Sequence, residues 1–391
     1  MDGAIKQATR SRLALRVAVG AFFFMAGLSF ASWASRIPAI QQKLHLSEAA
    51  LGGVLFAIPA GLMCSLPFTG WVITKIGSRK LLIAAIILYG CLLTGLGAAQ
   101  NVYELVACLF FYGFAGNAVN IAVNTQAVAT EKLYEKPIMA SFHGIWSMAG
   151  FTGAGIGIFM IGKNIAPFHH FIFILVLMLA GVIYFSRDLE DDSSRASEEK
   201  VVLSIRERLH SMVPLLKLGV IAFCSMICEG TMFDWSGVYF RKVILAQNGW
   251  IGAGYFAFMC TMALGRFIAD RFAGKYGLKR TLQLSGSLTA TGLLISVLFP
   301  YLLPAILGFM LVGIGVSSVV PMIYSSAGKT SVMSPGVALT AVSTIGFLGF
   351  LFGPPVIGFI AGIATLRASF LLIACMGMSV AIISSRTNLQ H

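Results

Sequence analysis

Charged side chains are scarce in this sequence, and no catalytic signature accompanies them. Only 11% of the 391 residues are Asp, Glu, Lys or Arg, whereas soluble domains carry about 25%. The sequence has no HExxH motif, no GxSxG motif and no GxxxxGK loop followed by Ser or Thr. These absences argue against an enzyme and against an ATP-driven pump, and no cofactor is expected.

Cysteine pairs at metal-binding or redox spacing are also missing. No CxxC pair occurs, no His stands at metal-ligand spacing, and the seven cysteines fall in apolar stretches, at positions 64, 91, 108, 224, 228, 260 and 375. Free cysteine behaves as a small apolar residue that packs well. We therefore interpret all seven as packing residues and predict no metal site.

Long apolar runs take the place of the missing polar features, since 58% of the residues are hydrophobic. About 20 apolar residues in a helix cross a hydrocarbon core of roughly 30 Å. The sequence predicts an all-α membrane protein with twelve transmembrane helices, near residues 13–40, 48–73, 79–99, 104–130, 138–162, 166–186, 213–242, 248–273, 279–299, 302–328, 335–363 and 367–386. The first run is too long for a signal peptide and is kept as a span.

The positive charges are distributed unevenly among the loops between these spans. With both termini in the cytoplasm, 22 of the 28 Lys and Arg residues lie on the cytoplasmic side, and the other six are Arg36, Lys43, Lys163, Arg241, Lys242 and Arg367. Cytoplasmic loops of membrane proteins carry an excess of these residues. The net charge of +13 is thus explained by topology, and a nucleic-acid partner is not expected.

The chain divides into two related halves. The long polar segment 188–211 predicts a cytoplasmic linker between an N-terminal six-helix bundle at 1–187 and a C-terminal six-helix bundle at 212–391. A shift of 200 residues superimposes Lys75 and Gly77 on Lys275 and Gly277, and Gly113 on Gly313. Two parallel repeats of this kind predict two pseudo-symmetric bundles with a solute site near the membrane midplane.

The loop between the second and third spans carries a family resemblance. Residues 70–80, GWVITKIGSRK, resemble the signature loop GxLaDRxGRR of the major facilitator superfamily, with Thr74 where the family usually has Asp. The resemblance implies a gating role for Lys75, Gly77 and Arg79. In the looser second copy it implies the same role for Arg266 and Asp270.

Three further stretches narrow this resemblance. ASWASRIPAI at 31–40, LGGVLF at 51–56 and EGTMFDW at 229–235 resemble the YbjJ-like branch of inner membrane proteins, which lies near the fucose-permease-like sugar transporters. The branch implies a bacterial inner (plasma) membrane location and a sugar-like solute. Drug/proton antiporters of the superfamily usually carry an Arg early in the fourth span and a Gly-Pro motif in the fifth, and this chain has neither.

Few ionisable residues lie inside the predicted spans, so each one needs a reason to be there. Glu229 lies deep in the span at 213–242, Asp234 is nearer its outer end, and His143 lies in the span at 138–162. A carboxyl group at low dielectric can alternate between neutral and charged forms, as proton coupling requires. We expect Glu229 to carry the coupling, with Asp234 and His143 as substitutes. The alternative is a carboxylate held permanently by a partner.

Arg36 and two tryptophans mark a predicted outer gate. Trp33 in the first half and Trp235 in the second occupy matching positions, with a slip of two residues. We expect Arg36, Trp33 and Trp235 to gate the outer side, with Arg36 pairing with Asp234. The alternative is that Trp235 and its neighbour are simple anchors at the membrane interface.

Three amides predict the solute-facing surface. Asn117, Asn120 and Asn124 recur at i, i+3 and i+7 on an otherwise apolar span. Amides both donate to and accept from hydroxyl groups, which suits a neutral polyol, although Asn also joins helices inside membranes. Ser29 and Ser32 on the first span, with Glu229 and Tyr324, complete the predicted substrate-binding residues.

These observations predict a secondary active transporter that works by alternating access and is coupled to protons. Its solute is small and polar, with a sugar-like compound as the first expectation. The alternative function is an efflux carrier that exchanges amphipathic compounds or drugs for protons. The expected partners are the solute, a proton or other ion gradient and the lipid bilayer, and the expected state is a monomer.

Overall fold

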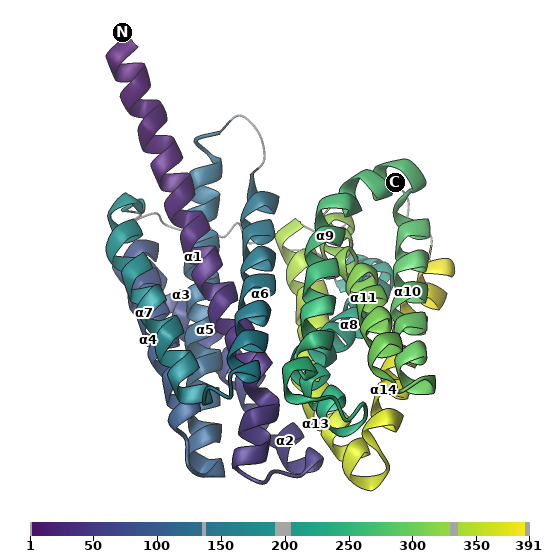
Figure 1. Ribbon diagram of the computed structural model, residues 1–391. Coiled ribbons are helices and arrows are strands. Elements are labelled where there is room, and N and C mark those ends of the chain that lie inside the picture. Colours follow the sequence, from purple (N-terminus) through teal and green to yellow (C-terminus); the bar gives the residue numbers. More distant parts are fainter. Residues whose placement is uncertain (1, 135–137, 192–204, 329–334, 388–391) are drawn as a thin grey trace. The chain divides into compact units, whose positions relative to one another are not determined.

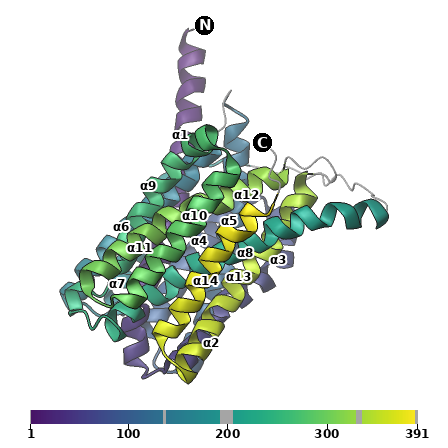
Figure 2. The same ribbon diagram turned by 90° about the vertical axis from the view of Figure 1, so that its right-hand side faces the viewer.

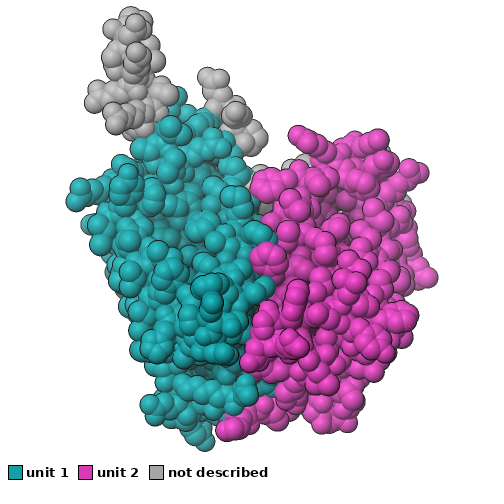
Figure 3. Space-filling view, viewed as in Figure 1, with its two compact units in different colours: residues 1–44, 57–197 teal, residues 45–56, 198–391 magenta. Residues whose placement is uncertain are grey.

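The computed structural model describes residues 2–134, 138–191, 205–328 and 335–387. Within these residues the regular structure is helical, and twelve stretches are long and apolar enough to cross a membrane. The predicted all-α fold with twelve spans is confirmed. The structure divides into two compact units, coloured separately in Figure 3: residues 1–44 with 57–197, and residues 45–56 with 198–391.

Unit 1 contains six α-helices and a short 3-10 turn among its described residues (Figure 1). The helix α5 packs against both α3 and α4, while α1 packs mainly on α6 and α7. The bounds are α1 (Asp2–Lys43), α3 (Ala57–Ile76), α4 (Ser78–Ala98), α5 (Val102–Glu131), α6 (Met139–Gly162), α7 (Pro167–Phe185) and η1 (Ser186–Asp188).

Unit 2 contains eight α-helices and one 3-10 turn in the part of the chain that is described (Figure 2). The helix α8 packs against α13 and α14, and α11 packs between α9 and α10. The bounds are α2 (Glu48–Leu55), α8 (Ile205–Lys242), η2 (Asn248–Trp250), α9 (Ala253–Tyr276), α10 (Leu278–Leu298), α11 (Leu302–Ser317), α12 (Val319–Gly328), α13 (Pro335–Ile363) and α14 (Leu366–Ser385).

The short helix α2 belongs to unit 2, although the sequence places it in the first half of the chain. It packs against α13, where a Cβ added at Gly52 would lie 2.6 Å from the carbonyl oxygen of Pro354 and 2.9 Å from the Cα of Gly358. Only glycine allows two backbones to approach this closely. The units therefore differ from the predicted halves in residues 45–56. The predicted division at the 188–211 linker remains a prediction, because residues 192–204 lie outside the described part.

Two predicted spans are each built from two helices, and a proline explains both breaks. Proline has no N–H group to donate to the carbonyl four residues earlier. Pro59 leaves the carbonyl of Leu55 without this bond, and α2 ends at Leu55. Pro321 does the same to Ser317, where α11 ends. Both predicted spans, 48–73 and 302–328, are therefore interrupted within their length.

The internal repeat is visible in the backbone. The helices α4 and α10 begin at Ser78 and Leu278, each directly after a glycine with positive φ, 80° at Gly77 and 79° at Gly277. This conformation is readily available only to glycine. A Cβ at Gly113 would collide with the carbonyl of Ile58, and a Cβ at Gly313 would collide with that of Phe258. The same 200-residue shift relates both pairs.

Candidate functional site

A partly buried ion pair lies between α8 and α9 of unit 2. The guanidinium Nη2 of Arg266 lies 3.4 Å from Oε1 of Glu229, and the two side chains are 23% and 10% exposed. A charged side chain inside a bilayer is costly unless it has a partner. Each of these two side chains is the partner of the other, and their opposite charges cancel. Glu229 and Arg266 were predicted in separate roles, in coupling and in a cytoplasmic gate, and the structure brings them together.

Two hydroxyl groups accompany the ion pair. Tyr324, on α12, lies close enough to Glu229 to interact electrostatically with it. Its hydroxyl oxygen and that of Ser225, one turn before Glu229 on α8, are buried and accept or donate no hydrogen bond among the described residues. Unit 2 thus holds a carboxylate, a guanidinium and two hydroxyls in one region of the predicted spans. Such a set can take up a proton and can bind polar groups of a solute.

The other predicted ionisable residues, Asp234 and His143, lie on α8 and α6. Asp234, which is partly exposed, follows Glu229 by five residues on α8. The ring of His143, an exposed residue of α6, meets that of Phe23 edge to face at 5.4 Å. His143 belongs to unit 1 and Glu229 to unit 2.

The three predicted amides of α5 divide into two environments. Asn117 is buried and donates from Nδ2 to Oγ of Ser65 on α3, at 2.6 Å. Asn120 is exposed and accepts a 3.0 Å hydrogen bond at Oδ1 from Nδ2 of Asn124. The amide of Asn117 therefore joins two helices, while the other two form a pair at the surface of unit 1.

The predicted serines of α1 are fully buried. The hydroxyl groups of Ser29 and Tyr112 are 3.1 Å apart, and the ring of Tyr112 stacks on that of Tyr89 with a centroid distance of 4.1 Å. Ser32 donates to the carbonyl of Leu28 in its own helix, at 2.7 Å. Tyr112 and Tyr89 were not predicted, although both are hydroxyl-bearing residues inside apolar spans.

The predicted outer-gate residues are core residues of their own units. In unit 1, Arg36 is 2% exposed and donates from Nη2 to the carbonyl oxygen of Ile165, in the loop between α6 and α7. Trp33 is 1% exposed in unit 1, and Trp235 is 0% exposed in unit 2. Both indole rings are therefore buried inside the protein, where an interfacial anchor would be exposed.

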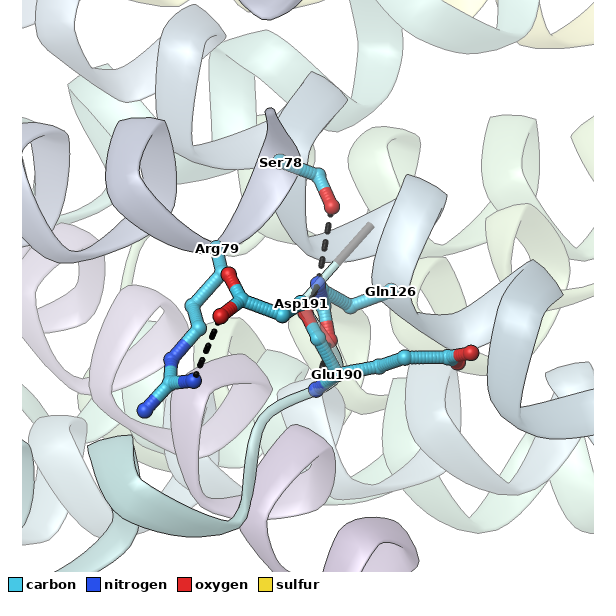
Figure 4. Close-up of polar contacts among 5 residues, drawn as sticks. All are labelled: Ser78, Arg79, Gln126, Glu190 and Asp191. Carbon is cyan, nitrogen blue, oxygen red and sulfur yellow. Dashed lines mark hydrogen bonds and ion pairs between the residues drawn. The ribbon is translucent and has the colours of Figure 1, made fainter. Parts of the chain in front are cut away.

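The signature loop has partners within unit 1. Lys75 lies over the ring of Trp71 at 4.3 Å, and the hydroxyl of Thr74 donates to the carbonyl of Trp71 at 2.8 Å. Arg79 forms an ion pair with Asp191 at 3.4 Å (Figure 4). Thr74, which stands where the family has an acidic residue, thus forms its hydrogen bond within its own helix. The partner of Arg79 comes from the start of the predicted linker. The side chain of Asp270 in the second copy lies outside the described residues.

Gln126, on α5, holds the start of the linker and was not predicted. It is fully buried, and its Nε2 donates to the hydroxyl of Ser78 and to the carbonyl of Glu190, both at 2.8 Å. Its Oε1 accepts from the backbone N–H of Glu190 at 3.1 Å. Figure 4 shows Gln126, Ser78 and Glu190 beside the ion pair of Arg79 and Asp191. In the sequence, the only signal for this role of Gln126 is an amide side chain at the end of an apolar span.

The part of the chain that is described contains no group of three or more His, Cys, Asp or Glu side chains that could hold a metal ion.

Known proteins resemble this chain over almost its whole length. The family model described as Major Facilitator Superfamily matches residues 17–331 and 243–387. A Yersinia pestis protein described as an uncharacterized MFS-type transporter is 32% identical over 379 residues, which cover 96% of each chain. The membrane protein MosC of Rhizobium meliloti is 32% identical over 367 residues, which cover 93% of this chain and 88% of MosC.

Solved structures share the fold at low sequence identity. A mutant of the nucleoside transporter NupG has a TM-score of 0.74 at 14% identity and covers 96% of this chain and 100% of its own. A bacterial homologue of the human lysosomal transporter Spinster has a TM-score of 0.71 at 13% identity and covers 96% and 97%. Together with the family match and the 32% identical relatives, the twelve spans and the repeated glycine contacts assign this chain to the major facilitator superfamily of membrane transporters.

Proposed function

We propose that this transporter couples the movement of a small polar solute to protons through Glu229 and Arg266. The family moves small solutes across membranes, and its members are not enzymes. The observation that carries the proposal is the partly buried ion pair between these two side chains, at 3.4 Å. It lies inside predicted spans, where an ionisable group is a functional hypothesis by default.

The pair supplies a chemistry for coupling. When Glu229 is ionised, its charge is neutralised by Arg266. When Glu229 takes up a proton, the guanidinium keeps its charge because arginine stays protonated in proteins, and the attraction between the two side chains is lost. Protonation therefore changes the net charge of the site by one and frees donors for the solute. Alternating access would then expose the carboxyl group to each side of the membrane in turn.

The hydroxyl and amide groups favour a hydroxyl-bearing solute, with a sugar-like compound as the first candidate. Tyr324 and Ser225 supply buried hydroxyls near the ion pair, and Asn120 and Asn124 supply amides at the surface of unit 1. The proposed placement in the YbjJ-like branch, near sugar transporters, supports the same class. It rests on the stretches at 31–40, 51–56 and 229–235.

We further propose a bacterial inner membrane location with both termini in the cytoplasm. The asymmetry of 22 against six Lys and Arg residues supports this orientation, and relatives of this chain are bacterial.

The test begins with a thermal-shift screen of purified protein against sugars, nucleosides, amino acids and cationic drugs. The solute with the largest shift is then loaded into reconstituted vesicles with an imposed pH gradient. Glu229→Gln keeps size and hydrogen bonding but fixes the neutral form, so exchange down a solute gradient should persist while uphill accumulation is lost. Asp234→Asn is the matched comparison on the same helix, and loss of uphill accumulation in that variant alone would assign the coupling to Asp234. Uphill accumulation by Glu229→Gln with normal pH dependence would refute the coupling role.

A further inference from the structure

A groove on the surface of unit 1 has an apolar floor and one positive charge. Its volume is ≈ 380 Å³, and it runs along α1 with one wall from α6. The lining side chains comprise one cation, no carboxylate and otherwise apolar or small groups: Leu13, Arg16, Val17, Gly20, Ala21, Phe24 and Ile145. Leu13 and Val17 are 59% and 49% exposed, and both belong to a predicted membrane span.

The groove owes its depth to a missing side chain. A Cβ at Gly20 would lie 3.0 Å from Cδ1 of Ile145, so any larger residue there would fill the space between α1 and α6. Along α1, the distance from Arg16 to Phe24 is eight residues, or about 12 Å at 1.5 Å per residue. One leaflet of the hydrocarbon core is about 15 Å deep. The groove below Arg16 therefore fits inside a single leaflet.

Arg16 is positioned by contacts from two other segments. Its Nη2 donates to the hydroxyl of Ser141 on α6 at 3.3 Å, and its guanidinium carbon lies 5.3 Å from the ring centroid of Tyr134. Both contacts hold the charged group at the mouth of the groove, and a guanidinium has five N–H donors, so these contacts leave donors over. Arginine matches phosphate oxygens with paired hydrogen bonds.

We propose that this groove binds one anionic phospholipid, with its phosphate on Arg16 and an acyl chain along Gly20. Basic pockets between transmembrane helices on the cytoplasmic side are known to suit anionic headgroups. The charge complementarity at Arg16 selects an anionic lipid over a zwitterionic one. The assignment to the cytoplasmic leaflet rests on the proposed orientation, whereas the binding itself does not.

The test uses the full chain purified in neutral detergent. Phosphatidylglycerol or phosphatidylcholine with identical acyl chains is titrated, and bound lipid is counted by native mass spectrometry alongside the melting temperature. Wild type should bind one phosphatidylglycerol more tightly than phosphatidylcholine. Arg16→Gln should weaken the binding of phosphatidylglycerol about fivefold, which is the effect of removing one interfacial cation. The same variant should leave the binding of phosphatidylcholine unchanged. Gly20→Leu fills the groove and should weaken both lipids.

The control variant is Arg12→Gln, which removes an exposed cation one turn earlier on α1 that does not line the groove. It should keep the preference for phosphatidylglycerol. An equal loss in Arg12→Gln and Arg16→Gln would refute a specific site and indicate general attraction to the basic end of the protein. If glycerol phosphate raised the melting temperature as much as phosphatidylglycerol does, the lipid proposal would be refuted and the groove would be a simple anion site. Dimerisation of the lipid-free protein that Gly20→Leu abolishes would assign the groove to a second copy of the chain.

Discussion

Glu48 and Lys242 form an ion pair of 2.5 Å between the first residue of α2 and the last residue of α8. The two side chains are 23% and 39% exposed, and such exposed pairs contribute only about 0–1 kcal/mol. The pair therefore does not by itself explain why α2 belongs to unit 2. The closer contact is at Gly358, where a Cβ would lie 2.6 Å from the carbonyl oxygen of Glu48 and 2.8 Å from the Cα of Gly52. Glycine packing holds α2 on α13, and the ion pair adds to it.

A cysteine pair can test this seam between α2 and α13. A Cβ at Gly362 would lie 3.1 Å from the Cβ of Ala49, close to the separation of about 3.5–4.5 Å in a disulfide. We expect Ala49→Cys with Gly362→Cys to form a disulfide under mild oxidation, located by peptide mass spectrometry.

The matched control is Ala50→Cys with Gly362→Cys, since residue 50 points about 100° away around the helix. Equal yields of disulfide from both pairs would mean that the cysteines meet by random motion, and the seam as described would be wrong.

Gln126 should matter more for stability than the ion pair beside it. Gln126→Leu removes the hydrogen bonds to Ser78 and Glu190, and leaving a buried polar group without a partner costs about 1–3 kcal/mol. Asp191 is 77% exposed and Arg79 is 28% exposed, so Asp191→Asn should cost less than about 1 kcal/mol. Melting temperatures of the purified variants, measured side by side, provide the comparison. A larger drop for Asp191→Asn would reverse our assignment of the main contact.

The amides of α5 should separate into a packing residue and solute-facing residues. Asn117→Leu breaks the hydrogen bond to Ser65, and we expect a lower melting temperature. Asn120→Leu or Asn124→Leu should change the free energy of unfolding by no more than about 0.5 kcal/mol, as other surface substitutions do, and should weaken solute binding. Unchanged solute binding in both surface variants, measured with the solute found by the screen, would leave the pair without a transport role.

Much of the fold is readable from the apolar runs and the repeat. The predicted span 79–99 is α4 (Ser78–Ala98), and its repeat 279–299 is α10 (Leu278–Leu298). Hydrophobicity reports where a helix crosses the membrane, but it does not report local breaks. The breaks after Leu55 and Ser317 depend on the backbone bonds lost at Pro59 and Pro321. The transfer of α2 to unit 2 depends on glycine contacts with a segment about 300 residues away.

The candidate site was predictable only in part. Glu229 was prominent because few charged residues occur within the spans. Its partner Arg266 was not recognised, because periodicity within one helix cannot tell which face of a second helix it meets. The Asn stripe illustrates the same limit, since Asn117 shares its face with Asn124 in sequence but bonds to Ser65 on α3.

The orientation of the chain is open to a direct measurement. Placing both termini outside would put 22 of the 28 Lys and Arg residues on the wrong side of the membrane. Fusions of alkaline phosphatase and green fluorescent protein to the carboxyl terminus should give fluorescence and no phosphatase activity. The reverse pattern would contradict the even number of spans with a cytoplasmic amino terminus.

The last prediction concerns the energetic coupling of Glu229 and Arg266. Removing one partner of a buried pair leaves an uncompensated charge, which costs about 3–5 kcal/mol in fully buried cases. Here the cost should be smaller, because Arg266 is 23% exposed and is therefore not fully buried, and because Glu229 can take up a proton when Arg266 is absent. The neutral double variant Glu229→Gln with Arg266→Gln buries no charge, so it should melt closer to wild type than either single variant does. It should nevertheless show no uphill transport, since no group remains to carry the proton. A double-mutant cycle on melting temperature measures the coupling, which we expect to exceed about 1 kcal/mol, above the usual 0.3–0.5 kcal/mol scatter of additivity. Additive losses of stability would show that the two charges act independently and would remove the basis for the coupling mechanism.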